Sequence, residues 1–138
     1  MLTHQLLQSF AGFDDFLIYL VISLALLGLF LAVYVRITPY HEIALIREGN
    51  MAAAYSLSGA MLGFIVPLAS AVGHSINPVD MVVWGVIALL IQLCAFMLTR
   101  MLLPNITADI PAGKPAPGFF LGAVSLGVGI LNAASMTY

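Results

Sequence analysis

The polar side chains that could do chemistry in this sequence lie inside long apolar runs. Asn132 and Gln92 each place an amide in such a run, and Ser70 and Ser125 each place a hydroxyl there. An amide in hydrocarbon is costly unless it is hydrogen-bonded, so it contacts either a ligand or ion or another helix. We expect a helix–helix hydrogen bond for both amides, with the ligand contact as the alternative. The serines can bond carbonyls of their own helix, which favours a packing role.

Pro67 stands in another apolar run, where it removes one helical hydrogen bond and predicts a kink. Its counterpart in the second half of the chain lies at residues 131–132, shortly after Gly127 and Gly129. Helices interrupted at corresponding places in two repeats are typical of transporter sites, although proline and glycine are also ordinary in membrane helices. The candidates for lining a polar path are Asn132, Gln92, Pro67, Ser70 and Ser125.

The titratable residues outside these runs show no catalytic or metal-binding spacing. His41, Glu42 and Glu48 could form a cation site, but a short helix lying in the membrane interface explains them without one. The sequence contains no phosphate-binding loop, no HExxH motif and no GxSxG elbow. We therefore expect no enzymatic activity, no cofactor and no metal. A net charge of −2 without a basic run also predicts no nucleic-acid partner.

The composition requires a lipid environment. The chain has 138 residues, 62% hydrophobic and 7% charged, whereas a soluble domain has about 25% charged residues. Uncharged runs cover residues 16–35, 51–72, 81–99 and 117–138. Each run is long enough to cross a hydrocarbon core of about 30 Å as a helix. The sequence therefore predicts an all-α integral membrane protein, a single domain with four transmembrane helices.

None of the four runs contains an Asp, Glu, Lys, Arg or His. Proton relays and voltage sensors are built from such groups, so transport driven by a carboxylate within one chain is disfavoured. The alternative is a narrow pore lined by Ser, Asn and backbone carbonyls, formed by several copies.

All basic residues fall in the loop after the first span and the loop after the third. They are Arg36, Arg47, Arg100 and Lys114. Short loops that carry Lys and Arg stay in the cytoplasm, so both loops are expected there. The two termini and the turn at residues 73–80 are then expected on the periplasmic side.

The two halves of the chain share an order of landmarks: an acidic residue, an apolar span, a proline, a glycine and a span rich in small residues. An offset of 64 residues aligns Gly49 with Gly113. Because each unit holds two spans, the copies keep one orientation in the membrane. We therefore predict two tandem parallel repeats, at about residues 13–75 and 78–138, with a short interfacial helix in the first long loop.

The content of small residues predicts which spans pack together. Gly, Ala and Ser make up eleven of 22 residues in the second span and nine of 22 in the fourth, against four of 20 in the first and three of 19 in the third. Small side chains let helix backbones approach closely in lipid. We expect the second and fourth spans to form the packed centre and the other two to face lipid. The expected contact positions are Gly59, Gly63, Gly118, Gly122 and Gly127.

An ordered set of residues in the first long loop and the second span resembles a known family. The set is TP at 38–39, Glu42, LI at 45–46, Asn50, AA at 52–53, Gly59, Gly63 and PLASA at 67–71, with NAASMT at 132–137 near the end. It resembles the YjfL-like inner-membrane proteins, catalogued as domain of unknown function 350, over roughly residues 13–138. The resemblance implies a bacterial inner-membrane protein of four spans without an established activity. Family members are often encoded beside relatives of the phage-shock membrane-remodelling protein, which implies a membrane-stress partner by neighbourhood alone.

These patterns together predict a non-enzymatic component of the lipid bilayer that assembles with itself or with a membrane-stress protein. The alternative is a small channel or transporter with its pathway along the second and fourth spans.

Overall fold

The computed structural model describes residues 1–136, and within that range every regular element is a helix. The helices are α1 (Leu2–Phe10), α2 (Phe13–Ile37), α3 (Glu42–Arg47), α4 (Met51–His74), α5 (Pro78–Leu102), α6 (Ile106–Asp109) and α7 (Pro115–Ser135). Four segments are long and apolar enough to cross a membrane: α1 with α2, then α4, α5 and α7. The predicted all-α fold with four spanning helices is confirmed. The last two residues of the fourth predicted run and of the chain lie outside the described range.

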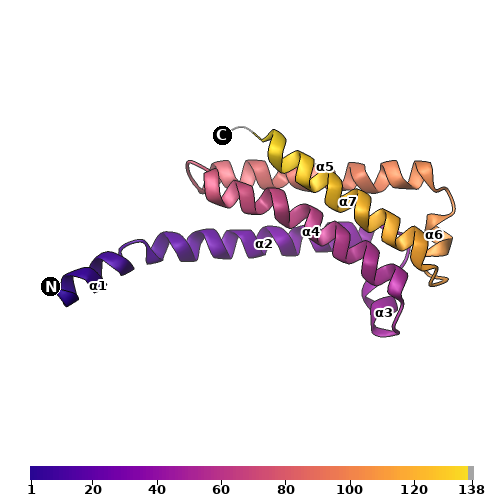
Figure 1. The fold of residues 1–138 in the computed structure, drawn as a ribbon, viewed down its shortest axis with the longest axis horizontal. Helices are drawn as coiled ribbons and strands as arrows, with labels where there is room; N and C mark the ends of the chain where they lie inside the picture. The colour runs from indigo at the N-terminus through magenta and orange to yellow at the C-terminus, as the bar shows by residue number, and fades with distance from the viewer. Residues whose placement is uncertain (137–138) are drawn as a thin grey trace.

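The spanning helices form one bundle in which α4 is central. Helix α4 packs against α2, α5 and α7, and α5 also packs against both α2 and α7. Figure 1 shows α4 and α7 crossing side by side, with α5 behind them and α2 along one edge. Helices α3 and α6 lie at one end of the bundle, and α1 extends beyond the other end (Figure 1). The bundle therefore has two distinct ends, one bearing both long loops.

Burial of the third span differs from the prediction. Helix α5 buries eight residues, whereas α7 buries five. The expectation that the third span faces lipid more than the fourth is wrong, because α5 packs against α2, α4 and α7. The first span does face outward, since α2 buries only Leu26, Phe30 and Tyr34.

Aromatic rings join α2 to the centre of the bundle. Phe30 of α2 stacks on Phe64 of α4 with ring centroids 4.6 Å apart, and Tyr34 meets Phe96 of α5 edge-on at 5.7 Å. All four side chains are fully buried. Offset-stacked and edge-on pairs add to the burial of apolar area, so this cluster fixes where the C-terminal half of α2 lies.

Asparagine side chains set the starts of two spanning helices. Asn50 accepts the N–H of Ala53 at the start of α4, and Asn77 accepts the N–H of Asp80 at the start of α5. Each bond satisfies a donor that the first helical turn leaves free. The amide of Asn50 also donates to the carbonyl of Ile110, at 2.9 Å. Asn50 therefore ties the first long loop to the second.

The two long loops end in the same local geometry. Gly49 and Gly113 have φ angles of 85° and 78°, which residues other than glycine rarely adopt. In each loop the residue after the glycine donates its N–H to a carbonyl five positions earlier, that of Leu45 at 2.9 Å or of Asp109 at 3.1 Å. This hydrogen bond is one half of the motif that commonly terminates helices before a change of direction. It turns the chain from α3 into α4 and from α6 into α7.

Helix α1 was not foreseen in the sequence. Its leucines Leu2 and Leu6 and the following Phe10 recur at a spacing of four residues, which places them on one side of the helix. None of its nine residues is buried in the bundle. An exposed apolar stripe on a short helix at one end of a membrane bundle is typical of a segment lying in the interface.

Candidate functional site

The closest contact in the molecule runs along α4 and α7 and is made by glycines. A Cβ added to Gly59 would overlap the Cα of Gly122, and a Cβ added to Gly118 would overlap the backbone of Ala52. At both positions the obstacle is backbone, which cannot rotate away. Only glycine therefore fits, and the two helices touch directly as their composition predicts.

Pro67 contributes to this contact. Because proline has no N–H, the carbonyl of Gly63, one turn earlier, lacks its usual helical donor. A Cβ at Gly129 of α7 would overlap this carbonyl oxygen, so a Cα hydrogen of Gly129 faces it. Such Cα–H···O contacts recur between packed helices and are worth about 0.5–1 kcal/mol. Helix α4 continues without a break through Pro67, which is buried. The proline thus supplies a free acceptor to the neighbouring helix.

Gln92 of α5 reaches the same place from a third helix. Its Nε2 donates to the carbonyl of Ser125 in α7 at 3.0 Å, and both side chains are fully buried. A Cβ on Gly63 would meet both this nitrogen and the Ser125 carbonyl. The structure therefore contains the predicted helix–helix hydrogen bond of Gln92. Two buried oxygens, Oε1 of Gln92 and Oγ of Ser125, have no hydrogen-bond partner among the described residues.

The other two polar candidates are Asn132 of α7 and Ser70 of α4. Asn132 is half-buried, and its Nδ2 is enclosed without a partner in the described part of the chain. The amide nitrogen of Asn132 bonds no other helix among residues 1–136, so the helix–helix hydrogen bond expected of it stays a prediction. Ser70 is also half-buried, and its carbonyl lies 2.9 Å from Nδ1 of His74, one turn further along α4.

Gly127 does not pack against another helix of the chain. A Cβ placed there meets nothing within 4 Å, whereas one placed on Gly129 overlaps α4. The predicted contact at Gly127 is corrected to Gly129. The remaining predicted positions, Gly59, Gly63, Gly118 and Gly122, all lie in tight contacts.

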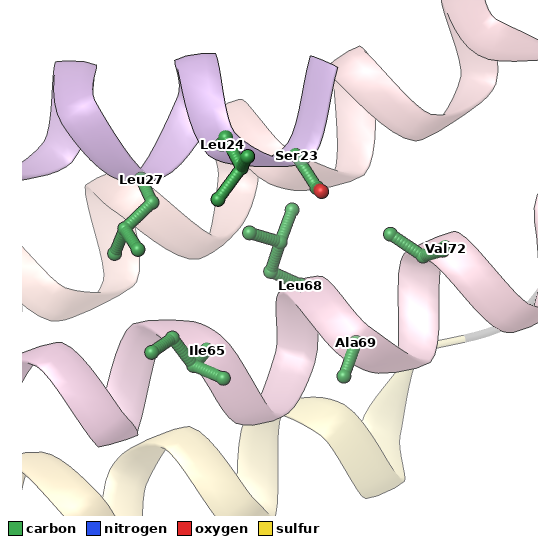
Figure 2. A pocket seen from close by; sticks show the side chains of 7 residues that line it. All are labelled: Ser23, Leu24, Leu27, Ile65, Leu68, Ala69 and Val72. Atoms are coloured by element: carbon green, nitrogen blue, oxygen red, sulfur yellow. The ribbon is translucent and has the colours of Figure 1, made fainter. Parts of the chain in front are cut away.

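A cavity of about 380 Å³ opens between α2 and α4, away from the α4–α7 contact. Figure 2 shows its lining, which consists of Ser23, Leu24 and Leu27 from α2 and Ile65, Leu68, Ala69 and Val72 from α4. Ser23 is the one polar residue among them, and its hydroxyl donates to the carbonyl of Leu20 in its own helix at 2.8 Å. The lining therefore offers contact to hydrocarbon and no recognition group for an ion.

A second polar cluster lies where α2 ends and α3 begins. Glu42 exposes only 1% of its surface, and its Oε1 accepts the hydroxyl of Thr38 at 2.5 Å. Its other oxygen, Oε2, is buried without a hydrogen-bond partner, and so are the hydroxyls of Tyr34 and Tyr40. Three oxygens that ordinarily form hydrogen bonds are thus enclosed together with none among the described residues.

The buried carboxyl of Glu42 forms no ion pair among residues 1–136. The one ion pair found in the described part of the chain joins Lys114 to Asp109 at 3.3 Å. Burial raises the pKa of Glu42 to about 7, and the hydrogen bond from Thr38 lowers it only in part. Burial also raises the pKa of Tyr40, to which nearby Glu42 adds. Removal of charged groups from water has this effect on acids generally, because it disfavours the ionised form.

The comparison with known families agrees with this architecture. Residues 1–136 match the family described as Domain of Unknown Function (DUF350). The chain belongs to the DUF350 family. Its similarity to the YjfL-like proteins, which its loop and span residues predict, is therefore confirmed.

Two curated DUF350-like relatives cover nearly the whole chain. The UPF0719 inner membrane protein YjfL of Escherichia coli (strain K12) is 40% identical over 134 residues, 97% of this chain and 99% of its own length. The UPF0719 transmembrane protein YshE of Bacillus subtilis (strain 168) is 29% identical over 124 residues, 86% of this chain and 90% of its own. No solved structure shows significant similarity to the chain. The family is thus one of membrane proteins whose function is not established.

Within this DUF350 chain, the sequence indicates the buried polar group Gln92 but not the burial of Glu42. Its pattern places Glu42 on the polar side of an interfacial helix, where water would solvate it, with a cation site shared with His41 and Glu48 as the alternative. The structure buries the carboxyl beneath Thr38, four residues earlier. The sequence feature that points to this burial is a hydroxyl, Thr38, four positions before the carboxyl of Glu42, with Pro39 between them. This spacing alone is a weak indication of a buried pair.

Proposed function

We propose that this DUF350 protein is a non-enzymatic component of the bacterial inner membrane that works as an assembly of its own copies. The observation that carries the proposal is the open face of α7 at Gly127, since the direct backbone contact of α4 with α7 is already made within one chain. The small residues that might have lined a path are used to bring helices together, and Gln92 bonds a carbonyl in place of a ligand. Among residues 1–136, no three His, Cys, Asp or Glu side chains gather where they could hold a metal ion.

The alternative function is a channel or transporter with its pathway along the second and fourth spans. The glycine contacts leave no width for water between α4 and α7 at Gly59, Gly63, Gly118 and Gly122. The cavity beside α4 opens instead toward α2 and is apolar. These contacts disfavour conduction through a single chain.

The open face of α7 supports assembly with a second copy. Gly127 meets nothing within 4 Å, and Ala123, one turn earlier, is exposed. Two small residues four positions apart on a lipid-facing surface allow another helix to approach closely. A membrane-stress protein as a further partner stays a prediction from the family resemblance.

The order of elements supports the proposed tandem repeat. The segment α2–α3–α4 is followed by α5–α6–α7, each with a long helix, a short helix and another long helix. Gly49 and Gly113, which the offset of 64 residues aligns, both have positive φ and the same following hydrogen bond. This correspondence of backbone geometry is independent of the sequence identities that suggested the repeat.

Assembly through α7 predicts that Gly127→Leu lowers the assembled fraction of purified protein in lipid vesicles. The added side chain would hold the second copy away, and a loss of about 1.4 kcal/mol corresponds to about tenfold weaker association. Single-molecule photobleaching of labelled protein at several protein-to-lipid ratios measures the assembled fraction. Gly28→Leu is the matched control, because Gly28 also meets nothing within 4 Å but lies on α2. A monomeric wild type, or equal effects of the two substitutions, would contradict assembly through this face.

We propose that the end bearing α3 and α6 is cytoplasmic, because all four Lys and Arg residues lie at or near that end and short basic loops stay inside. In a Cys94→Ser background, Ser75→Cys should react in intact cells with a thiol reagent that cannot cross the membrane. Ala112→Cys, an exposed position in the second long loop, should react only after the cells are opened. The reverse pattern of labelling would invert the proposed orientation.

A further inference from the structure

The unpartnered oxygens around Glu42 have no part in the proposed assembly. Glu42, Tyr34 and Tyr40 are each at least 95% buried, yet Oε2 of the glutamate and both tyrosine hydroxyls lack hydrogen bonds among the described residues. We propose that Glu42 is a proton-binding site, and that loss of its proton releases α3 from the bundle. The proposal is independent of which end of the bundle is cytoplasmic.

The surroundings of Glu42 disfavour the ionised carboxylate. Among residues 1–136 only the hydroxyl of Thr38 donates to it, whereas a buried carboxylate normally needs a paired cation or several donors. The charged and titratable groups close to this cluster are Tyr34 of α2, Tyr40 in the connecting turn and Arg100 of α5, and the adjoining cavity is lined by Arg36, His41 and Arg47. None of the cations among them forms an ion pair with Glu42 in the described chain. The pKa of about 7 agrees with a group that is neutral in slightly acidic solution and charged in alkaline solution.

An ionised Glu42 carboxylate could be solvated in a cavity close by. A cavity of about 690 Å³ opens beside the cluster and is lined by Arg36, His41 and Arg47 as well as by Glu42 itself. A charged carboxylate would be stabilised there by water and by the two arginines, whereas it is destabilised in its buried position. Helix α3 has only six residues, and Glu42 at its start already borders this cavity.

Helix α3 is attached to the bundle by few fully buried side chains, so the charge of Glu42 can affect whether it stays packed. Leu45 and Ile46 are only partly buried where they pack on the core. The folded pKa of Glu42, about 7, lies above its ordinary value of about 4.5. The folded state therefore binds the proton more tightly than the unfolded state. The stability that the protonated Glu42 gives to the packed position of α3 is therefore fully present below about pH 4.5. It is lost as the pH rises toward about 7.

Pulsed electron spin resonance on protein in lipid nanodiscs tests the release. Nitroxide labels at Ala44 of α3 and Leu102 at the end of α5, both exposed, report the separation of the two elements without titrating themselves. We expect one narrow distance distribution at pH 5 and a broad one at pH 9, with a midpoint near pH 7. In Glu42→Gln, which is neutral throughout, the distribution should stay narrow at both values. Glu48→Gln removes an exposed carboxylate from the same loop and should behave as the wild type.

Each outcome decides the proposal. A distance independent of pH in the wild type, or a transition that persists in Glu42→Gln, would overturn it. A transition that follows the concentration of Na⁺ or K⁺ at fixed pH would show that the site holds an alkali cation, which also overturns it. If Glu42→Gln fails to fold, the midpoint of thermal unfolding of the wild type still discriminates, since it should fall between pH 5 and pH 8 and then stay constant.

Discussion

Gly129→Ala should destabilise the folded protein by about 3 kcal/mol or more, whereas Gly127→Ala, two residues away on the same helix, should leave its stability unchanged. A methyl group on Gly129 overlaps the carbonyl oxygen and backbone of Gly63 in α4, and backbone can yield only if the helices separate. Overpacking of a filled core typically costs about 1–3 kcal/mol even where side chains can move aside. The same methyl on Gly127 meets nothing within 4 Å.

The midpoints of thermal unfolding of both variants and the wild type are measured in one detergent, with circular dichroism as the readout. Because the two variants share residue type, helix and substitution, any difference between their midpoints reports the α4–α7 contact. Equal midpoints would mean that the two helices do not touch at Gly63.

Helix periodicity explains which glycines the sequence could place correctly. At 3.6 residues per turn, Gly122 and Gly129 lie on nearly the same side of α7 as Gly118, whereas Gly127 lies on the opposite side. The prediction of Gly127 rested on the small-residue content of the fourth span and did not take this spacing into account. The helical spacing of Gly118, Gly122 and Gly129 within α7 identifies the side that contacts α4.

The four spans could be predicted because hydrocarbon imposes a simple rule on length and charge. The exposure of a whole helix is harder to predict from composition. The third span is rich in Leu, Val and Ile and looked lipid-facing, yet α5 is packed by three neighbours. In lipid, apolar residues suit the interior and the surface equally, so their presence does not distinguish the two.

Polar residues were also interpreted from type alone. An amide in an apolar run indicates burial, but its partner depends on what the facing helix presents. Gln92 faces the carbonyl of Ser125, whereas Nδ2 of Asn132 faces no acceptor among the described residues. The burial of Glu42 depends on the path of the loop that brings it to Thr38, which the four-residue spacing of the two side chains does not specify on its own.

Closure of the bundle also predicts that the reconstituted protein carries no ion current. The polar groups that a water path would need are Oε1 of Gln92 and Oγ of Ser125, which have no partner in the described residues. They are enclosed by the contact of α5 with α4 and α7, where Gly63 has no room for even a methyl group. We therefore expect Gln92→Leu to change stability slightly, by about the 0.6 kcal/mol typical of one hydrogen bond between membrane helices.

The most direct measurement is conductance across planar bilayers that hold wild-type protein and Gln92→Leu at matched density, with the assembly state of each checked in the same lipid. A packed, non-conducting assembly predicts no current above the protein-free bilayer for either form. Reproducible wild-type currents that Gln92→Leu abolishes, with the assembly intact, would contradict it and establish a conducting path through the bundle.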